Sequence, residues 1–442
     1  MSKPVGMPSP RPRSRRAATL LASLAVLAAA LAAALAAAPR AHAAIGIRYG
    51  LTDDAWLEDG PGSVDDRVAR LEAIGVRVVR FTLRWNEIAP TRPALATDPS
   101  DPAYDWSDAS SVLGALHAHG IEVVAQLLGT PRWANGGKAA NFAPTSASSF
   151  GAFAAAAAQE FPWIRKWVIW NEPNQAIWLR PTSPFLYTAR LLNPAYAAIH
   201  RAIPSAKVAG GGTAPRAAAG GISPVAFLTG MHAAHARLDA YAHNPYPLDP
   251  KHETPTTGGC GHCTTISLVD LARLESLVAK DFPKARIWLT EYGYQTSPPD
   301  RLLGVSYAAQ ARDQALAAYV AYTAPRVDLL IHFLYQDEPN VARFQSGLTT
   351  LGGKAKPSLA AFELPLAETA RRGSTTSLWG QLRAPAAGGD ATLERRVGTT
   401  WRRLATVVGG SAGFFRWHGT LPRGSVVRIV AGSLAGAPLA IG

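Results

Sequence analysis

The sequence has 442 residues, of which 48% are hydrophobic and 17% are charged, so it is too apolar to be disordered throughout and long enough for more than one domain. Its formal charge of +13 suggests a polyanionic partner, but the charge is unevenly distributed. Residues 1–43 carry a net +6 and residues 370–442 a net +8, which leaves −1 for residues 44–369. The neutral central part argues against nucleic-acid binding, and we expect no nucleic-acid partner.

The first 43 residues have the pattern of an export signal. A basic stretch ending at Arg15-Arg16 precedes an Ala/Leu-rich run over 17–38, and the small-residue pattern Ala-His-Ala follows at 41–43. This pattern predicts a signal peptide over 1–43 and a secreted protein that has no membrane attachment after cleavage. The apolar run is also long enough to span a bilayer, so an uncleaved anchor is the alternative. Because of the arginine pair, export by the twin-arginine route is an alternative to export by the Sec route.

Eight short apolar runs alternate with helical patterns from residue 45 onward. The runs are 45–51, 76–83, 121–127, 166–171, 206–212, 238–243, 285–291 and 328–335. The first helical pattern begins at Ser63, has Asp66 three residues later and stops at Gly75. Repeated strand and helix alternation forces parallel strand pairing, so the sequence predicts an α/β fold, a (β/α)₈ TIM barrel over 44–369. An open doubly wound sheet is disfavoured because no nucleotide-binding glycine pattern follows the first strand, and the glycines at 210–212 fit a tight strand end.

The pattern changes in the last part of the chain. Residues 370–442 show no helical period, only β-like runs at 377–383, 399–408, 413–418 and 425–431 between Gly/Pro turns. We expect a small all-β, sandwich-like module, either a spacer or a contact to a cell-envelope glycan that would hold the protein at the cell wall. Its tryptophans, Trp379, Trp401 and Trp417, are expected to be core residues rather than stacking platforms.

Two glutamates stand where a barrel active site is expected. Glu172 follows the fourth apolar run, and Glu291 ends the seventh. Active sites of such barrels lie at the carboxyl ends of the strands, where an acidic side chain has no packing value. A pair of carboxylates across the mouth of a barrel is what glycoside cleavage requires.

The residues around these glutamates resemble a known group of enzymes. Asn-Glu-Pro at 171–173 and Thr-Glu-Tyr-Gly at 290–293 resemble the acid/base and nucleophile motifs of the clan A glycoside hydrolases, closest to families 39 and 5. The resemblance covers about residues 45–365 and not the C-terminal module. It implies that Glu172 is the general acid/base, that Glu291 is the nucleophile, and that Asn171 binds the sugar 2-hydroxyl.

The same resemblance extends to residues around the nucleophile. Arg80 matches an arginine of the second strand, and a cation beside Glu291 would hold that carboxyl ionised. The sixth strand of the clan often ends in His-x-Tyr, and this chain has His243 and Tyr246 with one residue more between them. Both are expected to contact substrate, and Tyr246 is expected to touch the nucleophile.

Four further residues are expected in the substrate cleft, although they match the motifs of the clan less closely. The eighth run lacks the tryptophan that the clan usually has there, so Tyr335 or Gln336 is expected to replace it. Trp133, in a Thr-Pro-Arg-Trp loop, and Trp178 are expected to line the substrate cleft.

Further acids have alternative interpretations. Glu87 follows the wrong strand for the clan and is interpreted as a salt-bridge or capping residue in a loop. Asp337 and Glu338 fit either substrate binding or capping at the surface.

The two cysteines, Cys260 and Cys263, lie in the loop after the sixth strand. In an exported chain the leading interpretation is a disulfide that stiffens this loop over the site. Zinc binding is a weaker alternative because it would need a further ligand that the sequence does not indicate. Redox catalysis is also weaker because the cysteines do not lie in a βαβ pattern. We expect no metal and no cofactor.

The sequence as a whole therefore predicts a secreted, monomeric retaining glycoside hydrolase that acts on O-glycosidic bonds of a polysaccharide or oligosaccharide. A noncatalytic glycan-binding protein of the cell surface, built on the same barrel, is the alternative from another class. A transglycosylase using the same residues is the third. No residue discriminates the sugar, or endo from exo action.

Overall fold

The computed structural model describes residues 1–2, 6, 46–383, 389–410 and 412–442. Apart from three residues, the predicted signal segment lies outside the described residues. Contacts divide the chain into Met1–His42 and Ala43–Gly442, and the second unit holds both the barrel and the all-β region. Over the described part of the chain, no helix combines the length and apolar character needed to cross a membrane.

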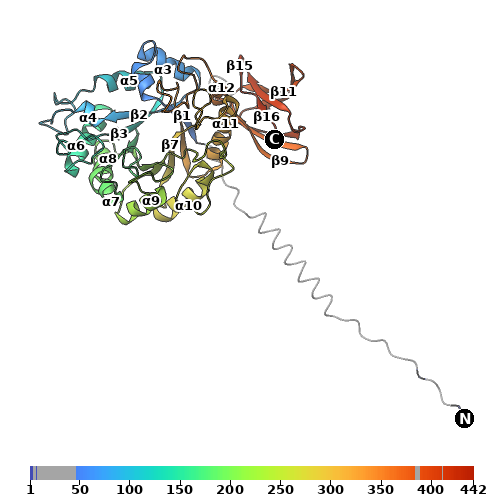
Figure 1. Cartoon of the computed structure of the whole chain (residues 1–442), viewed down its shortest axis with the longest axis horizontal. Coiled ribbons are helices and arrows are strands. Elements are labelled where there is room, and N and C mark those ends of the chain that lie inside the picture. The colour runs from blue at the N-terminus through green and yellow to red at the C-terminus, as the bar shows by residue number, and fades with distance from the viewer. Residues whose placement is uncertain (3–5, 7–45, 384–388, 411) are drawn as a thin grey trace. The chain divides into compact units, whose positions relative to one another are not determined.

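Eight parallel strands close a barrel in their chain order, and β8 pairs with β1 (Figure 1). They are β1 Arg48–Thr52, β2 Val78–Arg84, β3 Glu122–Leu128, β4 Lys166–Ile169, β5 Lys207–Thr213, β6 Ala240–His243, β7 Arg286–Tyr292 and β8 Val327–Phe333. The (β/α)₈ prediction is confirmed. Most predicted strands are correct to within two or three residues, and β4 and β8 end two residues earlier than expected.

Helices fill the connections between the barrel strands. They are α2 Asp54–Asp59, α3 Val64–Ala73, α4 Trp85–Ile88, α5 Ser107–Ala118, α6 Ala147–Glu160, α7 Pro184–Tyr187, the π-helical turn Thr188–Leu192, α8 Asn193–Ala202, α9 Pro224–Ala233, the 3₁₀ turn Leu268–Asp270, α10 Leu271–Asp281, α11 Tyr307–Thr323 and α12 Pro357–Glu363. Helix α3 begins as predicted, with a reciprocal capping box between Ser63 and Asp66. It ends before Gly75, whose φ of 82° suits glycine.

The barrel interior is a packed core of its own. It consists of the buried side chains of Val78, Val124, Val168, Ala209, Ala240, Ala242, Trp288, Leu329 and Ile331. Small residues of β5 and β6 leave room for the large indole of Trp288 on β7, which fills the barrel axis below the mouth. A filled interior confines any substrate site to the loops and strand ends at the rim.

The C-terminal region forms two antiparallel sheets, one in the order β13-β10-β9 and one in the order β12-β11-β14-β15 with β16 on β14. The strands are β9 Leu366–Arg372, β10 Thr375–Gln381, β11 Asp390–Val397, β12 Thr400–Val408, β13 Phe414–Thr420, β14 Val426–Ala431, β15 Leu434–Ala435 and β16 Leu439–Ala440. The predicted all-β region is confirmed. It begins at Leu366 rather than at residue 370, and sequence reasoning missed β9, β11 and the two-residue strands β15 and β16.

This region packs on the barrel beside α11 (Figure 1). Aromatic side chains make much of the contact. Trp379 is fully buried, with its ring centroid 5.6 Å from that of Tyr319 and 5.4 Å from that of Tyr322, both on α11. The buried guanidinium of Arg383 lies 4.2 Å from the ring of Tyr49 on β1. Trp379 is therefore a core residue, as expected.

The other two tryptophans of the region are partly buried. Trp417 packs against the core of the two sheets, and Trp401 lies under the guanidinium of Arg428 at 4.2 Å.

Candidate active site

Glu172 lies three residues beyond the end of β4, in a segment that leaves ordinary strand geometry. Trp170 and Glu172 have φ values of 70° and 39°, in the left-handed region that residues with a Cβ rarely adopt. The Trp170 amide donates to the Leu127 carbonyl and the Glu172 amide to the Gly212 carbonyl, both at 2.9 Å. Non-glycine residues in this region cost about 1–3 kcal/mol each and cluster at functional sites, where neighbouring structure fixes them.

The Glu172 carboxyl is half-buried and has one firm hydrogen-bond donor. The Asn244 side-chain amide donates to Oε1 at 3.1 Å, and the Thr290 hydroxyl donates to the Asn244 carbonyl oxygen at 2.7 Å, which orients the amide. Burial and the neighbouring charge of Glu291 raise the pKa of Glu172 to about 8, against the lowering effect of hydrogen bonds from Asn244 and the Trp178 side chain. Glu172 therefore holds a proton at neutral pH.

Glu291, the sixth residue of β7, lies in a contrasting environment. It is 7% exposed, and its Oε1 is 2.8 Å from a terminal nitrogen of Arg80, which is itself 4% exposed. The Tyr246 hydroxyl donates to Oε2 at 3.0 Å. Burial and the charge of Glu291 raise the pKa of Tyr246 well above its usual value, so the phenol stays a donor. A guanidinium at this distance favours the ionised carboxylate.

A glutamine that sequence reasoning missed connects the two halves of the site. The Gln126 carbonyl oxygen accepts from Arg80 at 3.0 Å, and its amide donates to the Trp170 carbonyl at 3.0 Å and to the Asn171 carbonyl oxygen at 3.4 Å. The Asn171 amide nitrogen has no acceptor among the described residues, so it is left to donate to a ligand. Arg80 is also held by the Thr52 hydroxyl, which accepts two of its hydrogen bonds at 3.3 Å.

His243 lies near the site but does not face it. Its ring is fully buried, with Nδ1 2.8 Å from the Thr213 hydroxyl and Nε2 2.9 Å from the Ile266 carbonyl. Burial lowers the pKa of His243 to about 4, so the ring is neutral at physiological pH. Both ring nitrogens are hydrogen-bonded within the protein. His243 therefore supports the loop after β6 and has no ring nitrogen left for the expected contact with substrate.

The end of β8 also differs from the expectation. Tyr335 packs on Trp56 with ring centroids 4.0 Å apart, and the Gln336 amide turns to the Leu351 carbonyl. The strand ends at Phe333, whose ring centroid lies 6.2 Å from that of Tyr246 in an edge-on arrangement. Phe333, and neither Tyr335 nor Gln336, is thus the β8 residue in contact with the nucleophile's tyrosine.

The two loop tryptophans have different surroundings. The Trp178 side chain is close enough to Glu172 to lower the pKa of that carboxyl. Trp133 packs edge-on against Trp85 at 5.5 Å and donates its indole hydrogen to the Ala89 carbonyl at 2.8 Å. Neither tryptophan is among the residues that line the cleft beside Glu172.

The acids with alternative interpretations have protein partners. Glu87 lies 3.9 Å from Arg84, in agreement with a salt-bridge role. The Asp337 carboxylate is buried in an ion pair with Lys356 at 2.6 Å, and Glu338 accepts from the Phe344 amide at 2.9 Å. These acids therefore support loops and carry no free carboxylate to the mouth.

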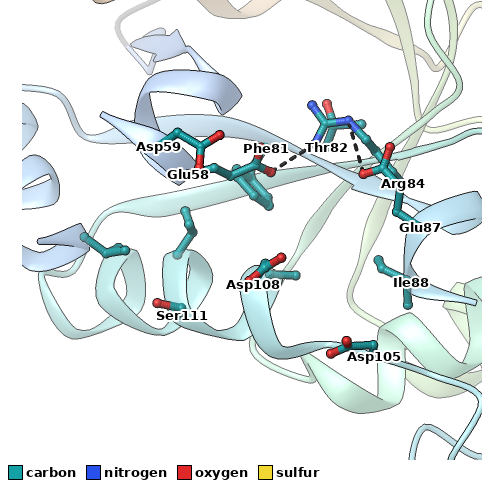
Figure 2. A pocket seen from close by; sticks show the side chains of 13 residues that line it. Glu58, Asp59, Phe81, Thr82, Arg84, Glu87, Ile88, Asp105, Asp108 and Ser111 are labelled. Carbon is teal, nitrogen blue, oxygen red and sulfur yellow. Dashed lines mark hydrogen bonds and ion pairs between the residues drawn. The ribbon is translucent and has the colours of Figure 1, made fainter. Parts of the chain in front are cut away.

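Two hollows lie near the carboxyl ends of the strands. A cleft of about 440 Å³ includes Glu172 and Tyr246 and is bounded by loops after β4 to β8. Figure 2 shows another, of about 250 Å³, where Arg84 lies between Glu58 and Glu87, above the exposed Asp108 of α5 and Asp105 before it. This second hollow contains neither candidate catalytic glutamate, and its central carboxylates are paired with Arg84, whereas Glu172 lines the cleft.

The cysteines Cys260 and Cys263 are joined by a disulfide in the loop between β6 and α10. Arg273 of α10 donates to the carbonyls of Cys263 and Thr265 and ties the loop down. Over the described residues, no group of three or more His, Cys, Asp or Glu side chains is arranged to hold a metal ion.

A closed parallel barrel with one glutamate after β4 and another near the end of β7 is the architecture expected of (β/α)₈ glycoside hydrolases. No known protein-family model matches the chain, and no curated protein matches it in sequence. Solved structures share its fold. A family 39 glycoside hydrolase from Xanthomonas axonopodis pv. citri has a TM-score of 0.56 at 15% identity, covering 87% of this chain and 93% of that one.

A second similar structure is CelM2, a bifunctional glucanase-xylanase from a metagenome library. Its TM-score is 0.50 at 12% identity, and the match covers 88% of this chain and 97% of that one. At these identities the similarity concerns the fold, which is the fold that the sequence resemblance predicts.

Proposed function

We propose that this chain is a retaining glycoside hydrolase whose acid/base is Glu172 and whose nucleophile is Glu291. The observation that carries the proposal is the contrast between the two carboxyls. Burial keeps a proton on Glu172, while Arg80 stabilises the negative charge of Glu291. Two carboxyls in such different surroundings, one buried with few donors and the other beside a guanidinium, are typical of an acid and nucleophile pair.

Each group has one task per step. The Glu172 proton passes to the glycosidic oxygen as the bond to the anomeric carbon breaks, and a Glu291 oxygen bonds to that carbon. In the resulting ester Glu291 is neutral, so its contribution to the raised pKa of Glu172 disappears. Glu172, now ionised and oriented by Asn244, takes a proton from water as the water oxygen displaces Glu291. Asn171 is in place to donate to the sugar.

A mechanism-based inhibitor tests this assignment directly. We expect one of a panel of 2-deoxy-2-fluoroglycosides with dinitrophenolate leaving groups to add a single glycosyl mass to Glu291. The Glu291→Gln variant should not be labelled, and the matched surface variant Glu87→Gln should be labelled normally. Absence of labelling across the panel, with aryl glycosides left intact, would favour the noncatalytic glycan-binding alternative. Transfer to an added sugar acceptor instead of water would identify a transglycosylase.

We further propose that the protein acts outside the cell after removal of residues 1–43. The basic and apolar pattern of that segment supports export, and a disulfide between the only two cysteines suits an oxidising compartment. N-terminal sequencing of the protein from culture medium should find a new terminus near residue 44. Protein retained in the membrane with its original terminus would instead support the anchor.

The β11–β12 hairpin supports a role for the C-terminal module in retention at an anionic envelope glycan. Arg395 lies directly opposite Arg402 in the register. The exposed Arg396 and Arg403 follow them on the other face of the hairpin, where Arg403 lies opposite Glu394. Like charges directly opposite are unfavourable in a sheet, so a polyanion would relieve their repulsion. Replacing the four arginines with glutamine should abolish salt-sensitive retention on isolated cell walls, and unchanged retention would contradict the proposal.

A further inference from the structure

The cleft beside Glu172 is lined mainly by apolar side chains. Five of the eleven exposed large apolar side chains among the described residues lie on this cleft or next to it: Ile177, Leu302, Leu303, Val341 and Phe344. Prolines of the loops after β5 and β6 extend the same surface. Exposed apolar side chains that gather at one place, rather than being scattered singly, mark a binding surface.

The polar side chains of the cleft are mostly turned toward the protein. The Gln175 amide donates to the Arg216 carbonyl, and its oxygen accepts from the Ala218 amide at 3.0 Å. The Gln295 oxygen accepts from the Gln345 amide at 3.1 Å. Apart from the Gln295 amide nitrogen and the residues of the catalytic pair's surroundings, Glu172 and Tyr246, little polar capacity remains for the hydroxyl groups of a further sugar ring, each of which would lose its water on binding.

Two cations are the exception. Arg216 and Arg343 are exposed, and over the described residues neither guanidinium is ion-paired with a carboxylate or hydrogen-bonded to another group. They stand on different loops of the same cleft, after β5 and β8. Guanidinium groups bind carboxylate, sulfate and phosphate well, often with two parallel hydrogen bonds.

The cleft reaches the proposed general acid. Glu172 lines it, and Tyr246, whose hydroxyl donates to Glu291 at 3.0 Å, lines its end nearest the nucleophile. A general acid must reach the oxygen that departs, so the space beside it receives the group attached to that oxygen.

Resting on the proposed function, we infer that the natural leaving group is an amphipathic alcohol, with an apolar body and an anionic substituent, and not a second sugar of a polysaccharide. The apolar body packs against Ile177, Leu303 and Phe344, and the anionic group pairs with Arg216 and Arg343. The substrate class is thus a glycoside of a hydroxylated aliphatic or aromatic acid. The sequence-based expectation of a polysaccharide or oligosaccharide substrate is the alternative that the experiments below test against this inference.

Binding of two fluorescent probes to the full chain tests the cleft without turnover. 8-Anilinonaphthalene-1-sulfonate is apolar and anionic, and N-phenyl-1-naphthylamine is its neutral relative. We expect the double variant Arg216→Gln, Arg343→Gln to weaken binding of the sulfonate by at least about fivefold and to leave the neutral probe unchanged. Ile177→Asn should weaken both probes, and Leu95→Asn, an exposed leucine elsewhere, should weaken neither. Competition by decanoate or by 1-naphthoate then tells an aliphatic body from an aromatic one.

Kinetics provide the second measurement. For the sugar that labels Glu291, the octyl glycoside should have a kcat/KM at least about tenfold above that of the methyl glycoside, because the leaving alcohols are equally basic and differ in buried apolar area. Probe binding that is unaffected by all cleft variants, or equal kcat/KM values, would overturn the inference while labelling of Glu291 left the proposed function intact. If the probes bind in the cleft but Glu291 is not labelled by any inhibitor, the result would contradict the proposed hydrolase and leave the cleft as a binding site.

Discussion

Replacing Glu172 with glutamine should stabilise the protein at high pH. A carboxyl whose pKa rises from 4.5 in the unfolded chain to about 8 in the folded protein keeps its proton between these values only in the folded state. The folded state therefore binds more protons, and the free energy of unfolding falls as pH rises through this window. At 1.36 kcal/mol for each pH unit, the loss reaches up to about 5 kcal/mol above pH 8. Glutamine keeps the hydrogen-bond acceptor and avoids the loss.

Urea unfolding followed by tryptophan fluorescence at pH 5, 7 and 9 measures the effect, and needs no substrate. The difference between Glu172→Gln and the native chain should be small at pH 5 and grow to its maximum at pH 9. The matched control is Glu87→Gln, at an exposed glutamate outside the pair, which should show no such growth with pH. Glu291→Gln takes the charged partner from the buried Arg80 and should destabilise by about 3–5 kcal/mol. It also removes a charge that raises the pKa of Glu172, so the stability of this variant should fall less steeply with pH. A stability difference for Glu172→Gln that does not change with pH would refute the assignment of the buried proton.

Three further substitutions test the surroundings of the pair. Asn244→Leu removes the donor to Glu172, so the pKa of that carboxyl should rise further and the alkaline limb of the kcat/KM profile should move to higher pH. Arg80→Met leaves Glu291 buried without a cation, and should cost about 3–5 kcal/mol in urea unfolding and prevent labelling of the nucleophile. Trp379→Ala should cost about 3–5 kcal/mol in the same assay, because it opens a cavity between α11 and the C-terminal sheets.

The barrel and its two glutamates were predictable because their signals are local. Apolar runs at regular spacing define buried parallel strands, and an acid at the end of such a run has no packing role. The residues that tune the pair carry no comparable local signal. Gln126 lies in the apolar run of β3, and its role depends on the register that brings β2 and β4 to either side of it. Asn244 acquires its role from Thr290, 46 residues away.

The end of β8 shows how a small boundary error changes a site. The apolar run predicted a strand to residue 335, but the strand ends at Phe333. Residues 333 and 335 of an unbroken strand would share a face, about 7 Å apart along it. Because the strand ends at Phe333, that side chain takes the last position at the mouth, and residues 334 onward belong to the loop. The backbone amides of Tyr335 and Gln336 are instead held by the buried Asp53 carboxylate at 3.1 Å, a contact over 280 residues that no local pattern indicates.

The position of Trp379 also determines how the role of the C-terminal module can be separated from catalysis. Charge patterning placed the boundary at residue 370, and on that view deletion of 370–442 would spare the barrel. In the structure β9 already begins at Leu366, and the deletion would strip Trp379 and Arg383 from α11 and β1. A truncated protein that lost activity could have lost it because the apolar surface of α11 was exposed and the barrel was destabilised, and not because glycan binding was lost. Substitution of the exposed hairpin arginines leaves this interface intact, so it isolates the effect of charge.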